Sequence, residues 1–418
     1  MRPLLPALLA LALVAGCSSD QSPEAGPKVD LHEQNAVFSY ALQELQEQGQ
    51  FAGAVTLVVA PRGAIALEGF GLADIASKRP MRRDSVFWIA SMTKPITSLG
   101  ILMLVEEGKL GLDDPVGKFL PAFRDQTLTS SKGPTKPRRA VTVRDLLTHS
   151  SGLTSASPTP AGQPVDAISL AAMTDFYARQ PLVSEPGATW AYSNAGMNTL
   201  GRIIEVVSGQ AYGDFVQHRF LDPLGMDSTS FWPTTEMVGR MATPYRKDKD
   251  TGELVAVGNS RFSSPLNDRR RTPLPAGGLF STAEDLTQLY QMLLRGGELD
   301  GHRYLQTETL RLMTSNQLGD LPKVSFAPGM HMGLGFHLVH SPQGVTESLS
   351  PGTYGHGGAY GTQAWLDPVR QRAYILLIQR TDLPNSDGSE SAASSNRRHG
   401  NSSDAKPAEL PPNAETAR

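Results

Sequence analysis

The sequence predicts an α+β protein in which an antiparallel sheet is built from both ends of the folded chain, is flanked by helices, and carries a mostly helical inserted lobe. Two observations support this prediction. β-rich runs gather at residues 53–70 and again at 333–380, and the segments between them show mainly helical spacing. Strands at both ends with helices between them are typical of an α+β architecture.

The first strand pair is predicted around the turn residues Pro61-Arg62-Gly63. The runs GAVTLVVA and AIALEGF flank this turn and are rich in β-forming side chains. Two such runs joined by a short turn predict a hairpin. Ahead of the hairpin, apolar residues between Leu31 and Gln50 recur at helical spacing and predict a helix.

The middle of the chain is predicted to be mainly helical, and strand signals return after it. The last helix begins with Ser281-Thr282-Ala283-Glu284, which has the spacing of a capping box. Residues 369–372 separate the last two strands as a second hairpin. The helices are predicted at residues 91–108, within VTVRDLLTHS, at 197–209 and at 281–295, and the strands in GLGFHLV, TQAWLDP and AYILLIQR.

The N-terminus has the features of an export signal. An apolar run from Leu4 to Val14 follows Arg2 and is too short to span a bilayer. It ends in small residues before Cys17, the only cysteine in the sequence, and this arrangement resembles a bacterial lipoprotein cleavage site. We therefore expect Cys17 to be lipidated rather than to remain a free thiol. Ser18 in place of aspartate implies, by the same resemblance, the periplasmic face of the outer membrane.

Composition divides the chain into successive parts. We expect residues 1–17 to be a lipoprotein signal peptide with its lipobox, 18–30 a flexible polar tether and 31–384 the folded domain. The stretch 385–418 is rich in Ser, Asn, Ala and Pro without an apolar period, which predicts a disordered tail. The 418-residue chain has a formal net charge of −3, which argues against a nucleic-acid partner. The oligomeric state is left open.

Ser91 and Lys94 are candidates for a nucleophile and its activating amine. A serine hydroxyl is a poor nucleophile at neutral pH unless a base lies within hydrogen-bond reach. Positions i and i+3 share one face of a helix, so the two side chains can meet. Pro95 fits only if the helix starts close to Ser91, because proline has no N–H to donate. The same spacing in Ser403–Lys406 of the polar tail shows that Ser-x-x-Lys alone is weak evidence; a helix-capping serine and a surface lysine are the alternative.

Two further motifs follow in order, Tyr192-Ser193-Asn194 and Gly355-His356-Gly357-Gly358. Ser-x-x-Lys, Tyr-x-Asn and His-x-Gly in this order resemble the penicillin-recognising serine enzymes, which include class C β-lactamases, DD-peptidases and their esterase relatives. Segments such as VTVRDLLTHSSGL and LPAGGLFSTAEDL resemble the family too, over about residues 35–384. The resemblance implies a β-lactamase/transpeptidase-like fold and a serine hydrolase with an acyl-serine intermediate.

The resemblance also implies a catalytic role for each motif. Ser91 would be acylated by the substrate, and Lys94 would be the partly desolvated amine beside it. Tyr192 would take the serine proton, deliver it to the leaving group and later activate water. The backbone N–H groups of Ser91 and Ala359 would form the oxyanion hole.

Substrate contacts are implied at Asn194, His356, Gly357 and Gly358. A turn residue is the alternative for Asn194, and a structural histidine is the alternative for His356. Trp365 alternates with its strand and is expected in the core, and His149 in LLTHSSGL is interpreted as structural packing.

The third motif departs from the β-lactamases, which usually have lysine where this chain has His356. Histidine is mostly neutral at pH 7, so an anionic β-lactam or peptide terminus should bind less strongly. Among small-molecule ester or amide substrates we therefore expect carboxylic esters; a β-lactamase or D-amino-acid peptidase is the first alternative and a non-catalytic envelope binding lipoprotein the second. The sequence contains no G-x-S-x-G elbow and no residue cluster with metal-ligand spacing, so we expect no cofactor and no metal.

The end of the domain is a second departure. The resemblance implies an amphipathic helix after the last strand, but SAASSNRRHGNSSD, which follows Glu390, has no apolar stripe. Either the sheet is covered differently, for instance by the N-terminal helix alone, or the reading frame is altered and folding is compromised.

Overall fold

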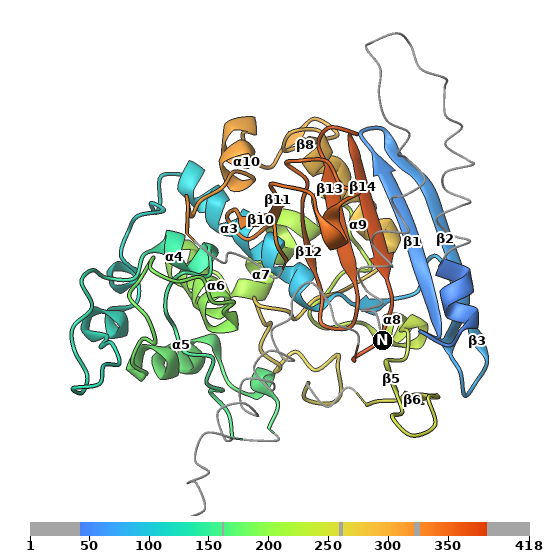
Figure 1. Cartoon of the computed structure of the whole chain (residues 1–418), viewed down its shortest axis with the longest axis horizontal. Coiled ribbons are helices and arrows are strands. Elements are labelled where there is room, and N and C mark those ends of the chain that lie inside the picture. The colour runs from blue at the N-terminus through green and yellow to red at the C-terminus, as the bar shows by residue number, and fades with distance from the viewer. Residues whose placement is uncertain (1–41, 161–162, 259–261, 322–326, 383–418) are drawn as a thin grey trace, which may run out of the picture. The chain divides into compact units, whose positions relative to one another are not determined.

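The computed structural model describes residues 42–160, 163–258, 262–321 and 327–382. Within them, an antiparallel sheet is formed from both ends of the chain in the strand order β10-β11-β12-β13-β14-β1-β2-β3. The N-terminal strands lie beside the C-terminal strands in Figure 1, where blue meets red. The strands are β1 (Gly53–Ala60), β2 (Gly63–Asp74), β3 (Arg79–Pro80), β10 (Met330–Met332), β11 (His337–Val339), β12 (Tyr354–Gly357), β13 (Gln363–Asp367) and β14 (Arg372–Leu377).

The sheet confirms the predicted fold class and both predicted hairpins. β1 pairs with β2 and β13 pairs with β14, each antiparallel. The two hairpins meet at the centre of the sheet, where Leu57 of β1 lies opposite Ile375 of β14. A segment near the start of the domain and one near its end are therefore neighbours.

One face of the sheet packs on helices. Alternate residues of β1, namely Val55, Leu57 and Val59, are fully buried in the main apolar core. Helix α9 (Ala283–Leu294) contacts β1, β2 and β14 on this side. The N-cap of α9 is Thr282, whose side chain accepts the N–H of Asp285. The N-cap expected at Ser281 is therefore one residue too early, because Ser281 belongs to a short strand.

The helical lobe lies to the left in Figure 1, coloured teal and green. Helix α6 is at its centre and contacts α3, α4, α5 and α7. It begins at Asn194, three residues before the predicted Met197, because Ser193 caps it by accepting the Gly196 N–H. The helices are α3 (Thr93–Glu106), α4 (Val143–Leu147), α5 (Leu170–Arg179), α6 (Asn194–Ser208) and α7 (Tyr212–Val216).

The other face of the sheet is partly covered by the residues that precede β1. Residues 42–47 are helical, and Leu42 packs with Phe51, Leu376 and Ile378 in a small apolar cluster. This segment lies within the range Leu31–Gln50 for which a helix is predicted, and the earlier part of that range lies outside the described residues. The predicted signal peptide, tether and C-terminal tail, and the missing final helix, lie outside the described residues.

A buried ion pair joins Asp166, in the helical lobe, to Arg271, in the segment that leads to Ala276. Arg271 Nε lies 2.7 Å from Asp166 Oδ2, and both side chains are almost completely buried. The N–H of Thr272 also donates to the Asp166 carbonyl oxygen at 2.8 Å. Removing one partner of such a pair leaves a buried charge without compensation, so this pair fixes the start of the segment that leads to Ala276.

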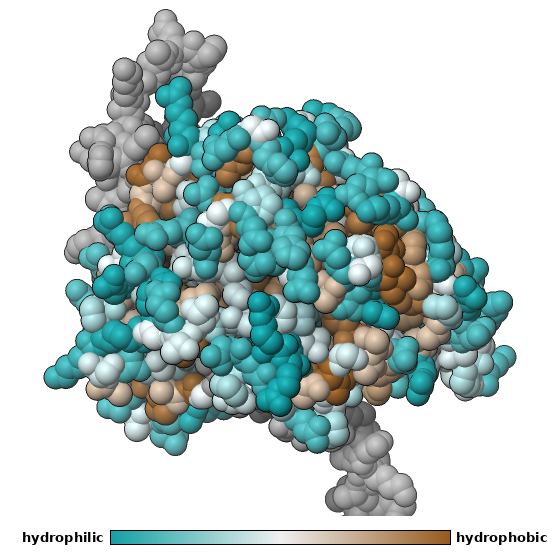
Figure 2. Space-filling view, turned by 180° about the vertical axis from the view of Figure 1, so that it is seen from behind, coloured by the Kyte–Doolittle hydropathy of each residue, from teal (hydrophilic) through white to brown (hydrophobic). Residues whose placement is uncertain are grey.

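The remaining elements are short. Among the described residues, no helix is long and apolar enough to cross a membrane. The face shown in Figure 2 is mainly hydrophilic with separate apolar patches. The short elements are β4 (Phe87–Trp88), β5 (Tyr245–Lys247), β6 (Leu254–Ala256), β7 (Phe280–Ser281), β8 (Glu298–Leu299), β9 (His302–Arg303), α8 (Thr235–Arg240), α10 (Thr307–Met313), the 3-10 helices η2 (Ala90–Met92), η3 (Val116–Lys118), η4 (Pro121–Asp125), η5 (Val165–Ala167) and η7 (Gly344–Thr346), and the π-helix η6 (Gln217–Leu221).

Candidate active site

Ser91 lies where a strained backbone leads into a helix. It is the middle residue of the 3-10 helix η2, which continues directly into α3. The preceding residue, Ala90, has a φ of 47°, a conformation that L-residues rarely adopt. Such strain persists only where the surrounding structure enforces it. Pro95 is the third residue of α3. The N–H groups of the first helical turn have no intrahelical acceptor, so proline, which has no N–H, breaks no hydrogen bond there.

Lys94 is fully buried and contacts the serine directly. Its Nζ donates a hydrogen bond to Ser91 Oγ at 2.9 Å and another to the carbonyl oxygen of Ala276 at 2.5 Å. The N–H of Ala276 in turn donates to Asn198 Oδ1 on α6 at 3.1 Å. The lysine is therefore held between α3 and a carbonyl that α6 positions. The Ser-x-x-Lys spacing predicted the first contact, whereas Ala276 and Asn198 were missed.

Tyr192 lies over the same lysine. Lys94 Nζ is 4.7 Å from the centroid of the Tyr192 ring, which is within the range of a cation–π contact. Tyr192 is half-buried in the loop just before α6. The Ser-x-x-Lys and Tyr-x-Asn motifs thus meet at one amine, although they are about one hundred residues apart in the sequence.

Three buried histidines surround the tyrosine. The ring centroids of His149, His337 and His356 lie 4.7, 6.5 and 6.1 Å from that of Tyr192. Burial lowers the pKa of His337 to about 3, and the nearby Lys94 charge acts in the same direction. Burial likewise holds the pKa of His149 and His356 well below the ordinary value. All three histidines are therefore neutral at pH 7.

The end of β12 brings the third motif next to Ser91. A Cβ on Gly358 would lie 2.6 Å from the Ile89 carbonyl oxygen, so only glycine allows this close approach. Thr362 Oγ1 also donates to that carbonyl at 3.2 Å. Ala359 follows in the turn, and its N–H has no acceptor among the described residues. The N–H of Ser91, in the first turn of its helix, has no intrahelical acceptor either. Both N–H groups are therefore available to donate to a bound group.

The remaining residues predicted for the site are His356, Asn194 and Cys17. His356 is fully buried, with Nδ1 2.7 Å from the Gly357 carbonyl oxygen. Asn194 is exposed at the first position of α6, and in the described structure its side chain makes no hydrogen bond. Cys17 lies outside the described residues. Trp365 is buried in the core, as predicted, and donates to Gln363 Oε1.

His337 and Asn198 are site neighbours that no motif indicated. His337 reaches the site because β11 pairs with β12, opposite Gly355. Asn198 was detectable only as a polar residue on the buried face of a predicted helix. In the described part of the chain, no group of three His, Cys, Asp or Glu side chains is placed to hold a metal ion.

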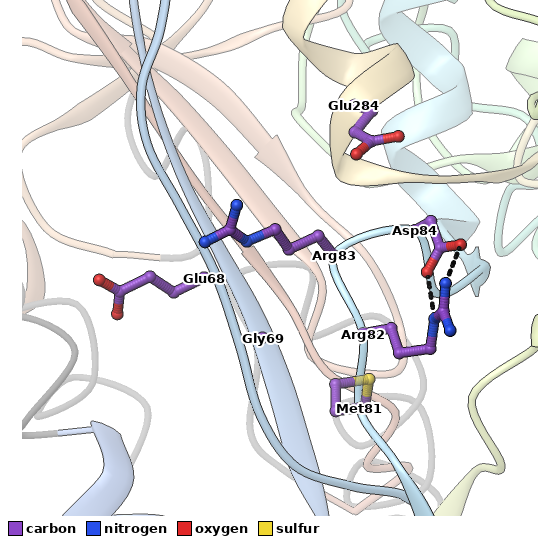
Figure 3. Close-up of a pocket in the computed structure, with 7 residues that line it drawn as sticks. All are labelled: Glu68, Gly69, Met81, Arg82, Arg83, Asp84 and Glu284. Carbon is purple, nitrogen blue, oxygen red and sulfur yellow. Dashed lines mark hydrogen bonds and ion pairs between the residues drawn. The ribbon is translucent and has the colours of Figure 1, made fainter.

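A surface groove of about 710 Å³ lies apart from these residues. Figure 3 shows it between β2 and the loop that follows β3, with the start of α9 at one side. Arg82 and Asp84, both on the loop that follows β3, form an ion pair at 2.8 Å. The groove carries charges of both signs, and none of the predicted site residues lines it. Its lining residues are Glu68, Gly69, Met81, Arg82, Arg83, Asp84 and Glu284.

This fold, with a serine–lysine pair and a tyrosine on one amine, is that of a serine hydrolase of the penicillin-recognising class. The chain belongs to the beta-lactamase family, whose family model matches residues 38–395. It is 34% identical over 365 residues to a protein of Mycobacterium tuberculosis, covering 81% of this chain and 88% of the relative. It is 28% identical over 370 residues to esterase EstB of Burkholderia gladioli, covering 82% and 88%. Among solved structures, it is similar to EstCE1, a hydrolase with promiscuous acyltransferase activity, with a TM-score of 0.72, 27% identity and coverage of 83% and 93%.

Proposed function

We propose that this serine hydrolase acts on small carboxylic esters through an acyl-Ser91 intermediate. The observation that carries the proposal is the 2.9 Å hydrogen bond between the buried Lys94 Nζ and Ser91 Oγ. An amine within reach of a serine hydroxyl and shielded from water is an arrangement that activates the nucleophile. A purely structural lysine would gain nothing from this position, because burying a charged group is costly.

The proposed reaction has two half-reactions. Ser91 Oγ attacks the ester carbonyl carbon while its proton passes to the deprotonated oxygen of Tyr192, whose ring lies against the Lys94 amine. The N–H groups of Ser91 and Ala359 stabilise the oxyanion that forms. The carbon–oxygen bond to the alcohol then breaks, and the alcohol leaves with the proton from Tyr192. In the second half, Tyr192, deprotonated again, removes a proton from water and the hydroxide attacks the acyl carbon. The bond between the acyl carbon and Ser91 Oγ then breaks, Tyr192 returns its proton to Ser91 Oγ, and the acid leaves.

The preference for esters is supported by the charge state of the third motif. His356 is fully buried and its pKa is held low, first by burial and then by His337 and Lys94. It therefore supplies no cation for the carboxylate of a β-lactam or a peptide terminus. An uncharged ester does not need such a cation. The similarity to esterase EstB supports the same choice.

The proposal is tested first by covalent labelling of the serine. We expect a fluorophosphonate to label the folded protein and Ser91→Ala to abolish the label. Ser98→Ala is a matched control, because Ser98 lies further along α3, is also buried, and its Oγ has no hydrogen-bond partner among the described residues. It should keep full labelling. If folded protein forms no adduct with a fluorophosphonate or a fluorescent penicillin, the chain is a binding protein and the hydrolase mechanism is refuted.

The substrate class is tested by a paired rate measurement. A short-chain aryl ester and a chromogenic cephalosporin are assayed with the same preparation, with Ser91→Ala as the blank. We expect the ester to have the higher kcat/KM. A higher value for the cephalosporin would identify the protein as a β-lactamase, and Ser91-dependent release of D-alanine from a peptide as the main activity would identify a D-amino-acid peptidase.

We also propose that Cys17 carries a lipid that anchors the protein to the periplasmic face of the outer membrane. The support is the sequence alone: a short apolar run that ends in small residues before the only cysteine. Radiolabelled palmitate should enter the full chain in a bacterial host and be lost in Cys17→Ser. Unlabelled protein in the soluble periplasmic fraction would contradict the anchor.

A further inference from the structure

Tyr192 lies in a loop whose backbone is held by hydrogen bonds to a residue of another segment. Residues 189–193 belong to no helix or strand. The N–H of Ala191 donates to the carbonyl oxygen of His149 at 2.8 Å, and the N–H of Ser193 donates to Nδ1 of the same histidine at 3.2 Å. A single residue therefore holds the amide on each side of Tyr192.

The His149 ring also contacts the tyrosine side chain. The two ring centroids are 4.7 Å apart, with an interplanar angle of 41°. His149 is 1% exposed, and its Nε2 has no hydrogen-bond partner in the described structure. The one side-chain hydrogen bond that His149 makes to a described residue is thus the bond to Ser193.

That bond requires a neutral imidazole. Nδ1 can accept the Ser193 N–H only when it carries no hydrogen, whereas both ring nitrogens of an imidazolium are donors. Burial and the nearby charge of Lys94 keep the pKa of His149 well below the ordinary value. The acceptor therefore persists through the neutral pH range.

The backbone around His149 is itself anchored. His149 has a φ of 59°, which favours residues such as Asn and Gly over most others. The following residue, Ser150, donates its N–H to Asp145 at 2.9 Å and accepts the N–H of Gly187 at 2.8 Å. The turn after α4 is thus tied to the segment that leads into Tyr192, which gives His149 a fixed support.

We propose that His149 is a positioning residue for Tyr192. It fixes the backbone on both sides of the tyrosine and one face of its ring, so that the phenol oxygen stays in place for proton transfer to and from Ser91. The inference rests on the proposed function, because it concerns the proton path of that reaction. It gives His149 more than the packing role expected from the sequence.

Two substitutions separate the hydrogen bond from the backbone conformation. Both His149→Gly and His149→Asn tolerate the positive φ, but only asparagine retains an acceptor near the position of Nδ1. For hydrolysis of the aryl ester, we expect His149→Gly to lower kcat about 100-fold with KM changed by less than about threefold, because misplacement of a catalytic group costs this much. We expect His149→Asn to remain within about fivefold of the parent kcat, because the acceptor is retained.

A stability control excludes a general loss of folding. Thr229→Val removes a buried hydroxyl whose partners, Asp285 and Ser281, lie on α9 and β7 and not in the loop that carries Tyr192. It should lower the thermal midpoint without changing kcat. If His149→Gly does not fold, His149→Ser replaces it. The serine side chain is too short to reach Ser193, and its positive φ costs only about 1–2 kcal/mol.

Two results would overturn the inference. One is a folded His149→Gly or His149→Ser protein with kcat within about threefold of the parent, and the other is a folded His149→Asn protein as slow as these variants. Failure of the proposed function is recognised separately, because it is seen in the parent protein as the absence of Ser91-dependent labelling and ester turnover.

Discussion

Acidification from pH 7 to pH 5 should destabilise the protein through its buried histidines. The pKa of His337 is about 3 in the folded protein against 6.5 for an ordinary histidine. Unfolding therefore takes up a proton whenever the pH lies between these values. The stabilisation is fully present above pH 6.5 and is lost as the pH falls towards 3. His149 and His356 have pKa shifts of the same direction and add to the effect.

The size of the His337 contribution follows from the two pKa values. At pH 5 the unfolded histidine is almost fully protonated and the folded one is not, while at pH 7 both are mainly neutral. The difference in the free energy of unfolding between these two pH values is about 2 kcal/mol for this one residue. Since small domains are stable by roughly 5–15 kcal/mol, the loss is large enough to measure.

The assay is urea unfolding at pH 7 and pH 5, followed by tryptophan fluorescence. His337→Gln should reduce the pH-dependent difference by about 2 kcal/mol, because glutamine does not titrate. Any packing cost of glutamine is the same at both pH values and cancels. His302→Gln is the matched control, because His302 is exposed on β9 and should leave the difference unchanged. If His337→Gln loses as much stability on acidification as the parent, His337 is not held neutral and the reasoning is wrong.

Further substitutions test the site and its support. Lys94→Met keeps the side-chain volume but removes the amine that bonds Ser91, and it should lower kcat/KM for the aryl ester at least about 100-fold with little change in circular dichroism. Gly358→Ala forces a Cβ to within 2.6 Å of the Ile89 carbonyl oxygen. It should therefore slow fluorophosphonate labelling and lower the free energy of unfolding by about 1–3 kcal/mol. Unchanged labelling would show that the site does not need this close approach of β12. Arg271→Met leaves Asp166 buried without its ion-pair partner and should cost about 3–5 kcal/mol in urea unfolding, whereas a loss below about 1 kcal/mol would contradict the buried pair.

Local spacing predicted those parts of the site that lie on one element. Ser91 and Lys94 are three residues apart at a helix start, so their contact follows from helix geometry. Tyr192 could be assigned only through the family resemblance, because no local pattern brings the start of α6 to the start of α3. Its position depends on tertiary packing between these helices.

Contacts made across the fold could not be predicted from spacing. The Ala276 carbonyl reaches Lys94 across 182 positions of sequence, and it is held there by Asn198 from a third segment. His337 comes from a strand whose partner decides which residues it faces. The helix starts at Asn194 and Ala283 were predicted at other residues, because the cap at Ser193 and a short strand that ends at Ser281 decide where each helix begins.

The pairing of β1 with β14 has a consequence for the order in which the chain folds. As synthesis proceeds, the β1–β2 hairpin is made early, but one edge of β1 has no partner until residues 372–377 exist. An unpaired edge strand invites association with other chains. Pairing over so long a separation is also slow. A chain truncated before β14 should therefore aggregate instead of forming the sheet, and a chaperone that shields β1 during synthesis should raise the yield of the full-length protein.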